Sequence, residues 1–185
     1  AVAAAARGPA RAEVPRPLDK SIRRYASQLQ EAADGLVFDV LPPVRQGNWT
    51  GICGIFEGGV MSRANLDFMA PVFGIVSGNE DFLPGAEDAS ERMDLALRQL
   101  GDEASPSGGL NPEQAQKYWK DAAAAVNSVM TAANQVVADD SALKKKVPPF
   151  VLVPLAGEAF ARSTKDRAKR CKGLVAEGVC LGEFS

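Results

Sequence analysis

Apolar residues recur at intervals of three and four along two long stretches of this chain, and that spacing restricts its fold more than any other feature. The stretches cover residues 18–41 and 111–138. Residues three and four apart share one face of an α-helix, whereas successive residues of a strand alternate between two faces. The spacing therefore predicts two long amphipathic helices, and with them an all-α protein.

The residues at this spacing are expected to form the buried face of each long helix. In the first helix they are Ile22, Tyr25, Ala26, Leu29, Ala33, Leu36, Val37 and Val40. In the second they are Ala115, Tyr118, Trp119, Ala122, Val126, Val129, Ala133 and Val136. Alanine, the strongest helix former, is frequent in both sets, which favours closely packed helices over a sheet.

Prolines and glycines divide the rest of the chain into shorter segments. Pro42 and Pro43 are expected to stop the first long helix, because proline cannot continue the backbone hydrogen-bond ladder. Residues 44–56 fit either a helix packed closely on a neighbour or an irregular turn. Further helices are expected over residues 62–76, with a kink at Pro71, over 86–100 and over 158–175.

The second long helix has a marked start. Asn111 is expected to cap it by accepting a hydrogen bond from a backbone N–H of the first turn. Pro112 suits that turn because its missing N–H would have no partner there. Gln114 is expected to reach back to the cap, as in a capping box.

Three regions follow from this division. Residues 1–17 hold three prolines and three arginines without apolar periodicity, and are expected to form an extended basic arm. Residues 18–140 are expected to form an up-and-down bundle of four to five helices with short connections. Residues 141–185 are expected to form a basic C-terminal helix and tail packed on the bundle.

The chain contains no histidine. Histidine is the commonest general base near neutral pH and the commonest metal ligand. Its absence removes Ser-His-Asp and Cys-His catalysis and most zinc, copper and haem sites. We predict a non-enzyme with no catalytic residue, no metal site and no cofactor of its own, and leave open a peripheral contact with a pigment or lipid.

Three cysteines are present, and none of them forms a CxxC pair, which argues against zinc-ribbon and thioredoxin sites. Cys171 and Cys180 bracket a short loop, and two interpretations stay open for them. They form a disulfide in an oxidising compartment, or remain free thiols in a reducing one. Cys53 lies among apolar residues and is expected to be buried.

Charge is segregated along the chain, although the net charge is only −2. Residues 77–105 hold eight acids and two bases, whereas residues 141–172 hold nine bases and two acids. Opposed patches of this kind steer docking onto a charged partner, and ordinary solvated helix faces are the alternative. The candidate docking residues are Arg7, Arg11, Arg16, Lys144, Lys145, Lys146, Arg162, Lys165, Arg167, Lys169 and Arg170.

Two other kinds of partner are not expected. A small net negative charge is not typical of a nucleic-acid-binding protein. A membrane span needs roughly 18 or more consecutive apolar residues. The most apolar window, residues 60–77, contains Arg63, Asn65 and Asp67, so no membrane span is predicted.

The elements of the chain follow one another in a fixed order. A basic Pro-rich arm comes first, followed by the first helix (LDKSIRRYASQLQEAADGLVFDV), the Pro-Pro pair and later the alanine-rich helix (YWKDAAAAVNSVMTAANQVV). This order resembles the lumenal extrinsic subunits of photosystems, nearest the PsbQ-like four-helix proteins of plants and algae. The resemblance implies a non-catalytic protein of the chloroplast thylakoid lumen, peripheral to the membrane. Such a protein docks on photosystem core or antenna proteins and stabilises or links subunits.

The chain departs from that family in two places, the Gly-rich residues 47–59 and the long tail after Pro148. These departures leave open a lineage-specific linker or antenna-associated subunit of either photosystem, and no functional residue is transferred. Two other functions remain alternatives. A soluble helical carrier of lipid or pigment needs an apolar cavity, and a small histidine-free enzyme needs convergent carboxylates or a lysine in a pocket.

Overall fold

The computed structural model describes residues 16–56, 68–79, 81, 83–104, 111–156, 159–163 and 165–166. Within these residues the regular structure is entirely helical, which confirms the predicted all-α class. The helices are α1 (Arg16–Gly35), the π-helix η1 (Leu36–Val40), α2 (Leu41–Gln46), α3 (Trp49–Phe56), α5 (Ala70–Val76), α6 (Ala86–Glu103), α7 (Pro112–Asp139) and α8 (Ser141–Lys144).

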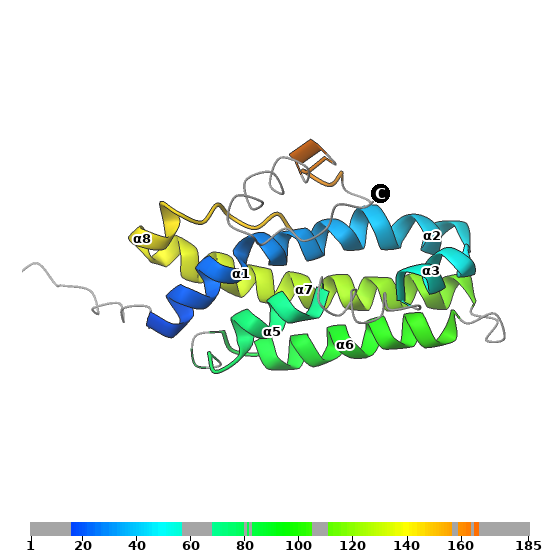
Figure 1. The fold of residues 1–185 in the computed structure, drawn as a ribbon, viewed down its shortest axis with the longest axis horizontal. Helices are drawn as coiled ribbons and strands as arrows, with labels where there is room; N and C mark the ends of the chain where they lie inside the picture. The colour runs from blue at the N-terminus through cyan, green and yellow to red at the C-terminus, as the bar shows by residue number, and fades with distance from the viewer. Residues whose placement is uncertain are drawn as a thin grey trace, which may run out of the picture.

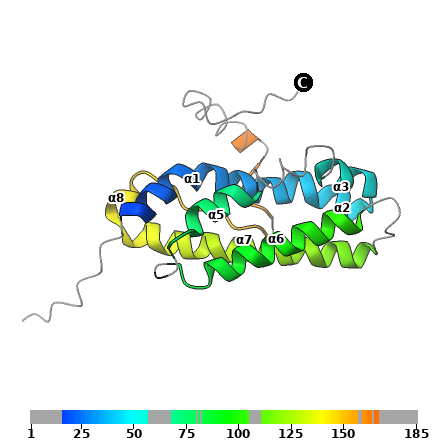
Figure 2. The same ribbon diagram turned by 60° about the horizontal axis from the view of Figure 1, so that its bottom comes forward.

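Three long helical stretches lie side by side (Figures 1 and 2). Helix α1 continues through η1 into α2, and α7 runs beside this stretch and beside α6. The colours in Figure 1 show that α6 and α7 run in opposite directions. The shorter α5 packs on α1 and α6, and α3 packs near the other end of the molecule.

The predicted buried faces are confirmed in both long helices. All eight residues expected on the buried face of α7 are buried. Six of the eight in α1 and η1 are buried, and Tyr25 and Val37 are partly buried against the same core. Cys53 is buried as expected, with its Sγ donating a hydrogen bond to the carbonyl oxygen of Ala104 at 2.8 Å. The helical period alone thus locates most of the core.

The prediction that Pro42 and Pro43 stop the first helix is wrong. The backbone continues through η1 into α2, where Pro42 lies in the first turn. A proline ring ordinarily clashes with the carbonyl four residues before it. In η1 the N–H of Leu41 reaches back five residues to the oxygen of Leu36, and this wider π turn makes room for the ring. The helix ends instead at Gly47, whose φ of 61° is left-handed.

The start of α7 was predicted correctly in part. Asn111 caps the helix, with its Oδ1 accepting a hydrogen bond from Glu113 N at 2.9 Å, and Pro112 is the first helical residue. Gln114 does not complete a capping box. Its Nε2 donates to the hydroxyl of Tyr118 at 2.7 Å, one turn further along the same face.

Two other expectations need revision. Pro71 lies in the first turn of α5, where a proline interrupts no hydrogen bond of that helix. Residues 62–67 of the expected 62–76 helix lie outside the described residues. The last helix was expected to begin at residue 158, but residues 159–163 are not helical. Two of their side chains, Phe160 and Arg162, instead contact η1 and α1, as described below.

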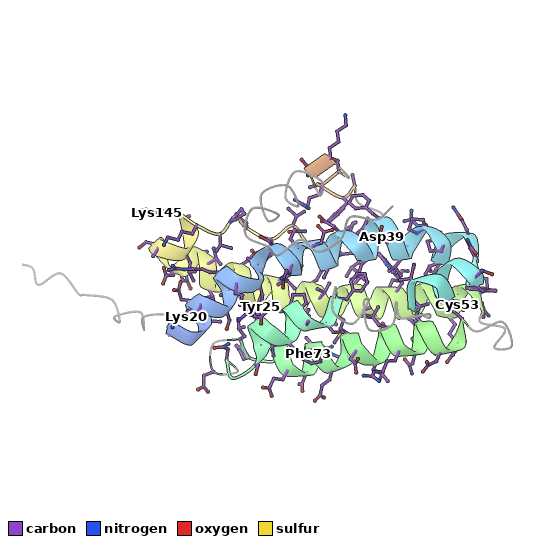
Figure 3. The ribbon with its side chains drawn as sticks, viewed as in Figure 1. Lys20, Tyr25, Asp39, Cys53, Phe73 and Lys145 are labelled. Carbon is purple, nitrogen blue, oxygen red and sulfur yellow. The ribbon has the colours of Figure 1, made fainter. Side chains whose placement is uncertain are left out.

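Helices α1 and α5 approach so closely at Gly74 that a side chain there would meet Tyr25 (Figure 3). A Cβ on Gly74 would lie 2.5 Å from Tyr25 Cζ. We therefore expect Gly74→Ala to lower the free energy of unfolding by about 1–3 kcal/mol through overpacking. The matched control is Gly54→Ala in α3, where a Cβ meets nothing within 4 Å. It should be neutral or stabilise by about 0.5–1 kcal/mol, and urea unfolding of both variants measures the difference.

Candidate functional site

An extended segment follows α8 and runs back over the helices (Figure 1, yellow to orange). We call residues 147–154 the strap. It has no helical structure, and its side chains at Val147, Phe150 and Val153 are buried. These three side chains belong to the hydrophobic core, while Leu152 is 41% exposed. Side chains of both α1 and α7 bind the strap, and we call the surface between these helices that it covers the groove.

Three side-chain carboxamides hold the backbone of the strap. Asn134 of α7 accepts from Phe150 N at 2.7 Å and donates to Phe150 O at 3.0 Å. Gln30 of α1 accepts from Val151 N at 2.7 Å and donates to Val151 O at 3.1 Å. Asn127 of α7 accepts from Val153 N and donates to Val153 O, both at 2.8 Å.

Each carboxamide offers one acceptor and two donors, so it can satisfy both the N–H and the C=O of one strap residue. An extended segment outside a sheet has no ladder partners, and partly buried backbone groups need such replacements. We call Gln30, Asn127 and Asn134 the carboxamide clamp.

The register of the clamp follows from helix and strand geometry. Asn127 and Asn134 lie seven residues, or two turns, apart on α7. Seven helical residues rise by about 10 Å. The two strap residues that they hold, Phe150 and Val153, are three residues apart, and three extended residues also span about 10 Å. The spacing of the two asparagines along α7 therefore equals the spacing of the two strap residues that they bind.

A second anchor holds the chain after the strap. The Phe160 ring packs on Phe38 of η1, with ring centroids 5.5 Å apart. The guanidinium of Arg162 forms a two-pronged ion pair with Asp34 of α1, with Nε–Oδ1 at 2.6 Å and Nη2–Oδ2 at 2.5 Å. The side chains of Arg162 and Asp34 are 9% and 0% exposed, respectively.

This ion pair is connected to the clamp. Gln30 Nε2 also donates to Asp34 Oδ1 at 3.2 Å, so the carboxylate is shared between Gln30 and Arg162. The hydrogen bond to Asp34 raises the pKa of Arg162 above its ordinary value, against the opposing effect of burial. Arg162 is therefore charged at any pH at which the protein folds, and it compensates the buried carboxylate.

A half-open cleft of about 400 Å³ lies where the strap meets η1 and α2. Five apolar side chains and two polar ones line it. They are Val37, Leu41, Pro42, Pro154 and Phe160, with Arg45 and Gln46. Its volume falls within the range of small-molecule sites, and Arg45 is exposed beside it.

The predicted docking residues have different surroundings. Lys144, Lys145, Lys146 and Lys165 are exposed, as a docking role requires. Arg162 is not available for docking, because its side chain is buried against Asp34. The other predicted residues lie outside the described part of the chain. They are Arg7, Arg11, Arg167, Lys169, Arg170, Cys171 and Cys180, together with the side chain of Arg16.

The described residues contain no group of three or more Cys, Asp or Glu side chains placed to hold a metal ion. In the same part of the chain, no helix combines the length and the apolar character that a membrane span requires.

The carboxamide clamp was missed by the sequence analysis. The sequence contains only a weak signal for it. Asn127 and Asn134 lie two turns apart at the edge of the apolar face of α7, and Gln30 lies next to Leu29 of the apolar face of α1. Gln30 is fully buried, which is unusual for this residue type and marks a structural partner.

No family model, curated protein sequence or solved structure matches this chain.

Proposed function

We propose that this protein is a non-catalytic extrinsic subunit that docks through charged surfaces on a photosynthetic membrane complex and stabilises or links its subunits. The observation that carries the proposal is a group of three adjacent exposed cations, Lys144, Lys145 and Lys146, which we call the lysine turn. All three side chains are exposed, and none forms an ion pair with a described residue. Figure 3 shows Lys145 at the α8 end of the molecule.

The lysine turn is held in place on both sides. Asp140 caps α8, with its Oδ1 accepting from Ala142 N at 2.8 Å and from Leu143 N at 2.9 Å. Leu143 and Val147, which bracket the lysines, are both buried. With the strap in place, the turn is thus held at both ends, and this order lowers the entropy lost on docking.

Helix α6 carries a second charged surface, which is acidic and so opposite in sign to the lysine turn. Glu87, Asp88, Glu91 and Asp102 are exposed along this helix. Segregated charge of both signs fits a protein that bridges two partners, since each surface steers a different encounter. The order of the helices, which resembles the lumenal photosystem subunits, supports core or antenna proteins as partners and the thylakoid lumen as the location.

Charge reversal in the lysine turn tests this proposal. We expect Lys145→Glu/Lys146→Glu to reduce retention on isolated photosynthetic membranes at least 10-fold at low salt, because exposed charge contacts dominate such docking. The matched control is Lys117→Glu/Lys120→Glu, the same charge change at exposed positions in the first half of α7. Equal retention of both variants, measured by co-sedimentation, would contradict docking through the lysine turn.

A second candidate function, a carrier of a small lipid or pigment, is favoured by the apolar cleft beside Phe160. Its half-open shape leaves a ligand partly in water, so the carrier function ranks second. Mass spectrometry of organic extracts from the purified protein distinguishes the two. A stoichiometric lipid or pigment would favour the carrier, and extracts free of both would favour the docking subunit.

A further inference from the structure

We propose that the groove between α1 and α7 is a binding site for an extended polypeptide segment, and that it accepts the strap of a second copy of this chain. The two copies would then exchange straps and form a dimer. The carboxamide clamp carries this inference, together with the buried ion pair between Asp34 and Arg162.

The clamp recognises backbone atoms rather than side chains. All six of its hydrogen bonds to the strap go to N–H or C=O groups of Phe150, Val151 and Val153. The apolar anchors are spaced by three residues, at Val147, Phe150 and Val153. Any extended segment with this spacing meets the requirements of the groove, and a second copy supplies an identical one.

The connection between the helices and the strap permits exchange. Most residues of this connection are exposed. They are Lys144, Lys145 and Lys146, and then Pro148 and Pro149. Beyond α8, the backbone hydrogen bonds of the turn all go to Leu143 O, from the N–H of Lys145 and, at 2.8 Å each, from Lys146 N and Val147 N. Two adjacent prolines favour an extended backbone and oppose a tight return, so the stretch can act as the hinge of an exchanged element.

Concentration decides between the closed monomer and the exchanged dimer. The contacts are the same in both forms, so the closed form is favoured only by the effective concentration of its own strap, which is on the order of millimolar for a short connection. Dilute protein should therefore be monomeric. Exchange should appear when the protein refolds at high concentration, or when the closed contact is made unfavourable.

Two variants with complementary charges make the closed contact unfavourable. Asp34→Arg places a second guanidinium in the groove, facing Arg162 of the same chain. Arg162→Asp places a second carboxylate on the segment after the strap, facing Asp34 of the same chain. Each variant alone therefore buries two like charges, and only reciprocal exchange between the two variants gives each groove one cation and one anion. The double variant Asp34→Arg/Arg162→Asp restores an opposite pair within one chain and is the matched control.

The two variants are refolded separately and together, and their masses are measured by native mass spectrometry. We expect the mixture to give a one-to-one heterodimer with a Tm at least about 5 °C above that of either variant alone. The double variant is expected to be a folded monomer. A mixture that contains no heterodimer, while the double variant folds, would overturn the proposal.

A measurement on the unaltered chain keeps the inference testable if the double variant fails to fold. Isotope-labelled and unlabelled protein are co-refolded at about millimolar concentration, and dimers are trapped by chemical cross-linking before dilution. We expect dimers of mixed mass, and their loss in Asn127→Leu/Asn134→Leu, which removes two of the three clamp residues. Mixed dimers that persist in this variant, or their absence from the unaltered protein, would rule out exchange through the groove.

Discussion

Replacing Arg162 with methionine is expected to lower the free energy of unfolding by about 3–5 kcal/mol, because it leaves a buried carboxylate without its cation. Asp34 is fully buried, and of its hydrogen bonds to Gln30 and Arg162 only the longer one, from Gln30, would remain. The buried carboxylate then lacks a cation, and the region around it is expected to open to water. Urea unfolding of the variant measures the loss directly.

Two controls separate this effect from the removal of an arginine as such. Arg98→Met breaks an ion pair with Asp94 in which the arginine side chain is 57% exposed, and it should change stability by at most about 1 kcal/mol. Asp34→Leu/Arg162→Met removes both buried charges and should recover most of the loss. If Arg162→Met and Arg98→Met destabilise the protein equally, the ion pair is not buried as described.

Asn127→Leu/Asn134→Leu is expected to release the strap while α1 and α7 stay folded. Leucine is similar in size to asparagine but leaves the N–H and C=O of both Phe150 and Val153 without partners. Each buried backbone group left without a partner costs about 1–3 kcal/mol. The strap therefore has a lower free energy when it leaves the helices and water hydrates its backbone. We expect amide exchange at Phe150 and Val153 to be at least about 100-fold faster, which corresponds to a loss of roughly 2.7 kcal/mol.

Gln135→Leu is the matched control for the clamp. Gln135 lies on the same helix and is exposed, and its carboxamide donates to Asp139 rather than to the strap. It should leave exchange at Phe150 and Val153 unchanged. Strap amides that stay equally protected in the asparagine variant and in this control would show that the clamp does not hold the strap.

The all-α fold and the buried faces could be predicted because helical periodicity is a local property. The apolar positions of α7, from Ala115 to Val136, follow from spacing alone. The proline pair was misread for a related reason. The rule that proline ends a helix assumes an α-helical turn, and η1 replaces that turn with a wider one that leaves space for Pro42.

The clamp and the buried ion pair could not be predicted in the same way, because they join distant parts of the chain. Asp34 and Arg162 are 128 residues apart, and in the sequence Arg162 looks like one member of a basic tail. Every residue of the strap is apolar, so the sequence does not show which of its side chains are buried, and its backbone partners are side chains of two helices. Such pairings are set by tertiary packing.

Native purification of the protein with its membranes tests the central claim most directly. Membranes are isolated at low salt from the cells that express the protein and washed with high salt, and the chain is followed by mass spectrometry. The docking account predicts that it co-migrates with a chlorophyll-protein complex at low salt and is released by the wash, because salt screens exposed charge contacts. Recovery in the soluble fraction at both salt concentrations, with no large partner, would contradict it.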